Sequence, residues 1–153
     1  MVLTFCFSTA AWAHKNHHHG EKASADVKKK SAEALIQIRE EYKRRVAPIF
    51  ERSCMDCHGS HTRYPWYYKI PGIKQKIDSD INESKEHLDM SDGYPFKSHE
   101  SPIDDLEEIA ESIEKGEMPP LLYGLMHRDS ALSENEKKII SDWVKSSVGL
   151  LRD

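Results

Sequence analysis

The chain has 153 residues, of which 38% are hydrophobic and 31% are charged, and its formal net charge is −4. This length suits one domain rather than two. The mild acidity gives no reason to expect nucleic acid or an anionic membrane as a partner. No stretch of about 20 apolar residues exists, which excludes a stable membrane span. Because the apolar residues are few, a covalent or metal-linked cross-link would help to stabilise the domain.

Residues 1–13 have the features of the end of a secretory signal peptide. They are apolar or small up to Ala11, and Ala11-Trp12-Ala13 is an A-x-A cleavage sequence. The positively charged start of such a peptide is missing, so an ordinary core segment is the alternative. Strongly polar sequence follows at once, and we therefore expect export, to the periplasm or to another compartment outside the cytoplasm.

Residues 14–25 are polar and show no apolar periodicity, so we expect a flexible segment. Its histidines are dense enough to bind Zn²⁺, Cu²⁺ or Ni²⁺ weakly, which makes a metal-binding tail the alternative. They are His14, His17, His18 and His19. The domain itself is expected over residues 26–153.

Apolar residues at helical spacing predict a helix from Asp26 to Val46, and Pro48 can start a new helical turn. A second helix is expected around Ile73, Ile77 and Ile81, up to Leu88. Gly93 and Pro95 favour a loop over residues 90–100.

Capping residues mark two further helices. Ser101 is a good N-cap before Pro102, and Gly116 can end that helix. Ser133 and Glu136 form a capping box for the last helix. The stripes expected to be buried are Ile103, Leu106, Ile109, Ala110 and Ile113 in the first, and Ile139, Ile140, Trp143, Val144 and Val148 in the second. No alternation typical of a strand competes, so the predicted fold class is all-α.

The segment Cys54-Met55-Asp56-Cys57-His58 is a C-x-x-C-H motif, the signature of c-type haem attachment. Two thiols three residues apart lie on one side of a helical turn, where each can add to one vinyl group of a porphyrin. His58 can then give its imidazole to the iron. We therefore expect one covalent haem c, which agrees with export.

Three other interpretations of this motif are weaker. A redox dithiol is usually found beside a βαβ pattern, which is absent. A zinc site needs a second pair of ligands; His61 or His87 could contribute, but no such pair is evident. A structural disulfide would close a very short loop.

Met118 is the candidate for the second axial ligand. It follows a predicted helix end and precedes two prolines that restrict the backbone, which lowers the ordering cost of holding a thioether against iron. The alternative is that Met118 only packs in a turn. Other candidate ligands are Met90, Met126, His61 and His127.

With these residues, the chain resembles the small haem-binding domain family of exported c-type cytochrome-like proteins. The resemblance covers about residues 45 to 148. Its matching segments are Ile49 to His58, Thr62-Arg63-Tyr64-Pro65-Trp66-Tyr67, Glu83 to Ser91, Gly116-Glu117-Met118-Pro119-Pro120-Leu121-Leu122-Tyr123 and Leu132 to Glu136, followed by Trp143. It implies a cytochrome c-like helical fold wrapped around one covalent haem, and it supports Cys54, Cys57, His58 and Met118 in the roles above.

Residues soon after the motif are candidates for contact with the haem edge. Trp66 and Tyr67 could pack there, and the Trp66 N–H or the Arg63 guanidinium could pair with a propionate. The alternative is that they are ordinary core and surface residues. A backbone carbonyl of Pro65 or Pro71 could accept the His58 Nδ1–H and so orient the imidazole.

These features favour a monomeric electron carrier rather than an enzyme, with redox proteins as transient partners. One alternative is a haem peroxidase or gas sensor, in which a labile Met118 opens the sixth position to peroxide, O₂, CO or NO. Another is a metal-binding protein that uses the His-rich tail.

Overall fold

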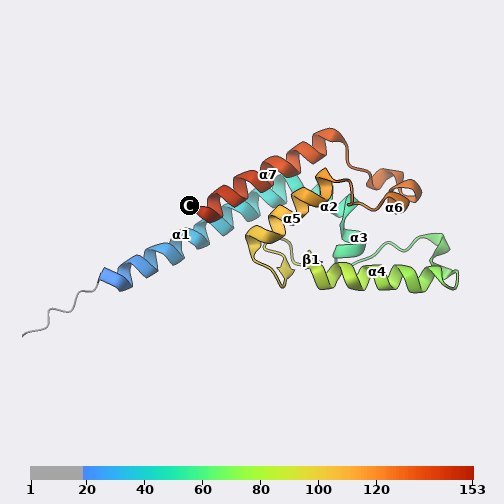
Figure 1. The fold of residues 1–153 in the computed structure, drawn as a ribbon, viewed down its shortest axis with the longest axis horizontal. Helices are drawn as coiled ribbons and strands as arrows, with labels where there is room; N and C mark the ends of the chain where they lie inside the picture. The colour runs from blue at the N-terminus through green and yellow to red at the C-terminus, as the bar shows by residue number, and fades with distance from the viewer. Residues whose placement is uncertain (1–18) are drawn as a thin grey trace, which may run out of the picture.

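The structure, a computed structural model, describes residues 19–153, with side chains described from Lys28 onward. The signal peptide expected at residues 1–13 and the His-rich residues 14–18 lie outside the described residues. The described part is helical apart from one small sheet, which confirms the all-α fold class (Figure 1). The longer helices are α1 His19–Glu41, α4 Ile73–His87, α5 Pro102–Glu114 and α7 Glu134–Arg152.

Shorter elements connect these helices. The short α-helices are α2 Ala47–Ser53, α3 Met55–His58 and α6 Leu121–Met126. One π-helical turn, η1 Tyr42–Val46, and two 3-10 turns, η2 Trp66–Lys69 and η3 Arg128–Ser130, complete the helical elements. Strands β1 Leu88–Asp89 and β2 Lys97–Ser98 form an antiparallel pair. Only β2 lies within residues 90–100, the expected loop; β1 comes just before it, and Leu88, expected to end the preceding helix, is its first residue.

Helix α1 begins earlier than the sequence predicted. Its backbone is already helical at His19, so it includes residues 19–25, which we expected to be flexible. Glu, Lys and Ala in this segment have high intrinsic helix propensity, which accounts for the extension. None of the described helices is both long enough and apolar enough to cross a membrane.

The π turn joins α1 to α2 in one continuous helical stretch. Proline has no N–H to donate, and in a regular helix its ring collides with the carbonyl four residues earlier. For Pro48 that carbonyl belongs to Arg44, inside the wider turn. There the Ala47 N–H reaches back to the carbonyl of Tyr42, five residues away. Pro48 therefore accounts for the change of helix type as well as for the new start.

The core is a cluster of aromatic rings between α1, α7 and the β1–β2 loop. Trp143 of α7 is 2% exposed, and its ring centroid lies 5.6 Å from that of Tyr42 and 5.7 Å from that of Tyr94. Phe50 and Phe96 pack against the same ring. Edge-to-face contacts of this kind add to the free energy gained by burying apolar area.

Helices α1 and α7 run antiparallel side by side, as Figure 1 shows. The Trp143 indole N–H donates to the carbonyl of Ile38 at 3.4 Å, and the Lys30 ammonium donates to the carbonyl of Asp153 at 2.8 Å. Helix α4 lies along the opposite edge of the molecule, and α3 contacts both α2 and α4. The C-x-x-C-H turn is thus held between the core helices and α4.

The helix caps confirm the sequence predictions. The Ser101 hydroxyl accepts from the Asp104 N–H at 3.3 Å, and the Ser133 hydroxyl accepts from the Glu136 N–H at the same distance. The Glu136 carboxylate accepts in return from the Ser133 N–H at 2.8 Å. Gly116 follows α5 with φ +70°, a conformation that glycine adopts without strain.

Candidate haem site

The two cysteines and the histidine of the motif share one tight turn. Cys54 follows α2, and its carbonyl accepts from the N–H groups of Cys57 at 3.1 Å and His58 at 3.0 Å. Both thiols are free and partly buried. The residues predicted to attach haem are therefore adjacent in space: Cys54 lies directly before α3, and Cys57 and His58 lie on it.

The thiols are not activated in the way a redox dithiol requires. Burial raises the pKa of Cys54 to about 12, and burial is also the main cause of the raised pKa of Cys57. A reactive dithiol or a zinc ligand needs thiolate, which a lowered pKa favours. Among the side chains that the structure describes, no three His, Cys, Asp or Glu groups lie together as metal ligands. The dithiol and zinc interpretations therefore gain no support.

The His58 imidazole is oriented by a backbone carbonyl. Its Nδ1 atom lies 2.8 Å from the carbonyl oxygen of Leu88, at the start of β1. The sequence suggests the carbonyl of Pro65 or Pro71 for this role, but in the structure the partner is Leu88. The reason is that α4 returns the chain to α3, which sequence distance alone does not reveal. An Nδ1–H donated to Leu88 leaves Nε2 as the free, metal-binding nitrogen.

The segment that follows α4 also makes a second hydrogen bond to His58. The Met90 N–H donates to the His58 carbonyl at 2.9 Å, and the Met90 side chain is only 4% exposed, within the aromatic core. Met90 is therefore packed behind the turn Cys54 to His58, which we call the attachment turn because haem attachment is predicted there. This makes it a poorer candidate for the second axial ligand than Met118, which is 41% exposed.

Asp56, between the two cysteines, is the centre of a polar network. Its carboxylate accepts from the Arg63 backbone N–H, from Arg63 Nε and from Arg63 Nη2, each at 3.1 Å, and from the Tyr123 hydroxyl at 2.7 Å. Burial tends to raise the pKa of Asp56, but the hydrogen bonds from Arg63 and Tyr123 lower it overall. The residue is therefore a carboxylate at neutral pH.

Tyr123 connects this network to other residues that the sequence singled out. Its ring stacks on His127 with a centroid distance of 4.2 Å and an interplanar angle of 20°. The His127 ring lies 6.3 Å from that of Tyr67, which meets Trp66 edge-on. Helix α6 is thus linked to α3 through Tyr123 and, through the neighbouring His127, to η2.

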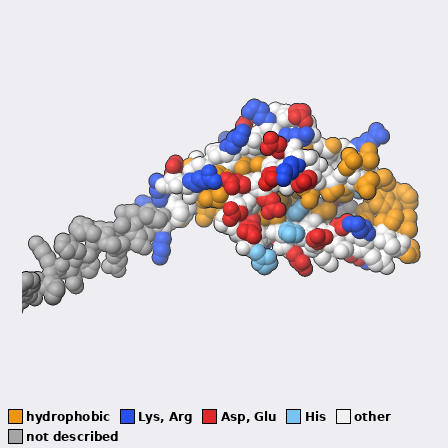
Figure 2. Space-filling model, viewed as in Figure 1, with side chains coloured by type: hydrophobic (Ala, Val, Ile, Leu, Met, Phe, Trp, Pro, Cys, Tyr) orange, Lys and Arg blue, Asp and Glu red, His pale blue; other side chains and the backbone are white. Residues whose placement is uncertain are grey.

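Apolar side chains are exposed on α6 and on the segment that leads into α4. Trp66 is 81% exposed, so its predicted packing on a haem edge stays a prediction, as does the pairing of Arg63 with a propionate. Figure 2 shows hydrophobic side chains gathered at the end of the molecule that carries α6 and the segment before α4. The large exposed ones are Tyr64, Trp66, Ile70, Ile73, Met118, Leu121, Leu122, Leu125 and Met126. Two free thiols, an oriented imidazole and exposed apolar side chains are together suited to binding a porphyrin.

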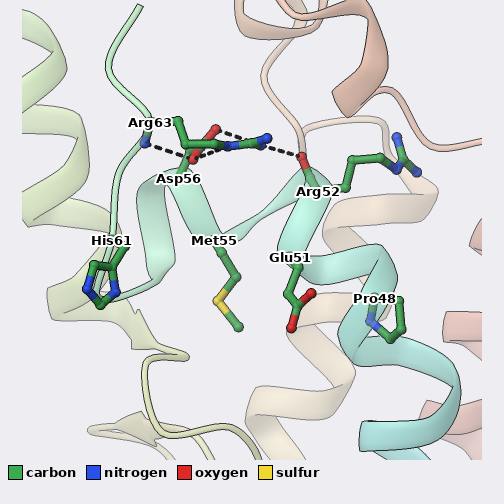
Figure 3. A pocket seen from close by; sticks show the side chains of 7 residues that line it. All are labelled: Pro48, Glu51, Arg52, Met55, Asp56, His61 and Arg63. Carbon is green, nitrogen blue, oxygen red and sulfur yellow. Dashed lines mark hydrogen bonds and ion pairs between the residues drawn. The ribbon is translucent and has the colours of Figure 1, made fainter.

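A separate open hollow of about 440 Å³ lies beside α2 and α3 (Figure 3). Neither cysteine nor His58 lines it, and both of its arginines are paired, Arg52 with Glu136 and Arg63 with Asp56. Its lining residues are Pro48, Glu51, Arg52, Met55, Asp56, His61 and Arg63. The hollow is therefore not the candidate haem site, and His61 belongs to it.

Sequence reasoning assigned no role to Asp56, Tyr123 or Leu88. An acidic residue inside the motif and a tyrosine shortly after Met118 are signals that sequence alone contains. Their contact joins positions 67 residues apart, which no periodicity could reveal. Leu88 acts through its backbone, so its side chain carries no signal at all.

The fold and the site define a small helical haem protein. Residues 11–146 match the haem-binding domain family, so the chain belongs to that family. It is also similar to a protein named cytochrome c peroxidase Ccp of Escherichia coli (strain K12), with 29% identity over 96 residues. That match covers 61% of this chain and 21% of the relative, so the chain spans about a fifth of the relative's length. No solved structure matches the chain significantly.

Proposed function

We propose that the protein is an exported c-type cytochrome that carries one covalent haem and transfers electrons between redox proteins. Cys54 and Cys57 would form the thioethers that hold the haem, and His58 and Met118 would bind its iron. The observation that carries the proposal is the attachment turn, which combines two free thiols with an imidazole oriented by Leu88. When bound, haem supplies an iron that changes between the ferrous and ferric states.

The protein's own residues have distinct tasks in this proposal. The cysteines fix the cofactor, so a small domain need not retain it by burial alone. The Leu88 carbonyl holds the His58 ring at a fixed orientation and makes its Nε2 a better ligand. Exposed apolar side chains such as Leu121 and Leu122 would be available to cover the porphyrin and exclude water from it. Partners would be redox proteins that meet the haem edge through a small, transient interface.

A pyridine haemochrome spectrum tests the proposal directly. The full chain is expressed in a bacterial host with a working cytochrome maturation system, and the periplasmic protein is purified. We expect one haem per chain, with the band position of a haem that carries two thioethers and a pigment that resists acid–acetone extraction. A colourless protein, or a pigment that the solvent removes, would overturn the proposal. The double variant Cys54→Ser, Cys57→Ser is the matched control and should yield mostly apoprotein.

A peroxidase or gas-sensing role is the second candidate, favoured by the similarity to the protein named cytochrome c peroxidase. It requires Met118 to leave the iron readily. Carbon monoxide separates the two functions, because a carrier with both axial positions filled binds it slowly and a sensor or peroxidase binds it at once. A low-spin spectrum that CO changes only slowly favours the carrier, and a high-spin spectrum that CO changes immediately favours the second candidate.

A further inference from the structure

Helix α6, which begins three residues after Met118, is attached to the rest of the domain without any buried residue. Leu121 and Leu122 are each 76% exposed, and Leu125 is 61% exposed. Apolar burial, which secures the longer helices, therefore contributes little to the position of α6. Some other interaction must hold it.

The Tyr123 hydroxyl supplies one such interaction from within α6 itself. It donates to Asp56 Oδ2 at 2.7 Å, and the acceptor lies between the two cysteines on α3. Arg63 binds the same carboxylate through both guanidinium nitrogens Nε and Nη2, which fixes its orientation. Hydrogen bonds to a charged acceptor are about twice as strong as neutral ones. One charge-assisted bond thus joins α6 to the attachment turn.

The other end of the segment is fixed as well. The N–H groups of Glu117 and Met118 both donate to the carbonyl of Ser112 at the end of α5, at 2.9 Å and 3.3 Å. The chain from Met118 to Tyr123 is therefore anchored at both ends, and the Met118 side chain is 41% exposed. These two anchors fix the backbone segment that carries the Met118 side chain.

We infer that Asp56 and Tyr123 form a clamp that positions Met118 for binding to the haem iron. The inference rests on the proposed function and extends it, because it assigns two positioning residues to the sixth coordination site. Asp56 lies on the same four-residue helix as Cys57 and His58, so the clamp fixes the Met118 segment relative to the attachment turn itself. In this role Asp56 and Tyr123 are positioning residues that would act on the iron only through Met118.

The test uses the holoprotein and the variant Tyr123→Phe, which keeps the ring and removes only the hydroxyl. We expect CO to bind to the ferrous form about tenfold faster, the effect of losing one hydrogen bond to a charged group. The weak far-red absorption of Met-ligated ferric haem should decrease, and the reduction potential should fall. Asp56→Asn should shift all three in the same direction and further, because it also weakens the contact with Arg63.

Two controls separate positioning from a general loss of structure. Tyr68→Phe removes another tyrosine hydroxyl that donates to an aspartate at 2.7 Å, Asp78 on α4, and it should leave CO binding unchanged. In a Met118→Ala background, Tyr123→Phe should have no further effect on CO binding, since no sulfur is left to position. A further effect there would assign the bond to general stability and overturn the inference.

The outcomes also distinguish this inference from the proposed function. If the haem is covalently attached and Met118→Ala changes the spectrum, but Tyr123→Phe behaves as wild type, the clamp is wrong and the cytochrome proposal stands. If Met118→Ala leaves the spectrum unchanged, Met118 is not a ligand, and both the axial assignment and the clamp fail. If no covalent haem forms, the proposed function itself fails. If the Asp56→Asn variant does not acquire covalent haem, the Tyr123→Phe variant alone decides the result.

Discussion

His58 Nδ1 lies 2.8 Å from the carbonyl oxygen of Leu88, thirty positions further along the chain. The contact gives the imidazole one hydrogen-bonded nitrogen and one free nitrogen. Histidines that bind metals almost always show this division, because the group that accepts the hydrogen bond from the other nitrogen fixes both the tautomer and the ring plane. In this protein the acceptor comes from β1, directly after α4. The length and direction of α4 therefore determine how His58 is presented.

Replacing Met118 with alanine should open the sixth coordination site. Without the thioether, CO should bind to the ferrous protein rapidly, and the reduction potential should fall because thioether ligation favours ferrous iron. Stopped-flow CO binding and a redox titration measure the two effects. Met126→Ala is the control, since Met126 is also exposed, at 59%, but lies at the far end of α6. A larger effect from Met126→Ala would exchange the assigned roles of these two methionines.

Trp143 should be among the most important residues for stability. Its ring is 2% exposed and packs against four other aromatic rings. Trp143→Ala should lower the free energy of unfolding by about 3–5 kcal/mol, because it removes buried area and leaves a cavity. Urea denaturation of the wild type and the variant measures the difference. Ile36→Ala, at a side chain that is 61% exposed, should cost less than about 0.5 kcal/mol.

The capping box of α7 should make a smaller, separate contribution. Ser133→Ala removes the hydroxyl that accepts from the Glu136 N–H. The loss of an N-cap of this kind costs about 1 kcal/mol of unfolding free energy. Ser146→Ala, at an exposed position within the same helix, should change stability by less than about 0.5 kcal/mol. Equal effects at both positions would argue against a specific cap.

The charge of Glu136 should make the free energy of unfolding depend on pH. Its pKa is lowered in the folded protein, chiefly by the hydrogen bond from the Ser133 N–H and further by Arg52, whose Nη2 lies 2.6 Å from the carboxylate. A group with a depressed folded pKa contributes stability above its unfolded pKa, and this contribution is lost as the pH falls through the folded value. The difference in unfolding free energy between wild type and Glu136→Gln should therefore shrink between about pH 6 and about pH 3. A constant difference across this range would mean that the charge of Glu136 adds nothing.

Local sequence signals predicted the parts of the fold that local interactions decide. Ser101 and Ser133 begin helices because their hydroxyls reach N–H groups three residues further on, which the sequence displays directly. The buried faces of α5 and α7 followed from helical spacing, and Leu106, Ile140 and Trp143 are indeed buried. The C-x-x-C-H motif located the attachment turn for the same reason, since all its members lie within one turn.

Long-range contacts account for what sequence analysis missed. Gly93 and Pro95 favoured a loop, and no helical spacing marked Tyr94 or Phe96 as core residues. Both are nevertheless buried, because the β1–β2 turn folds them against Trp143. The bond from Tyr123 to Asp56 was equally hidden, because neither residue's neighbours indicate its partner.

The π turn between α1 and α2 has a consequence for how the long helix faces the core. Ala34, Ile38, Tyr42, Val46 and Phe50 are all buried, at a strict interval of four residues. In a uniform α-helix each such step advances the stripe by about 40° around the axis, so a row of five would wind away from its partner. A turn with more residues per revolution rotates the stripe back. The π turn therefore keeps the buried side chains before and after it on the face of the helix that lies toward α7. It also determines the side of the helical stretch on which Cys54 follows.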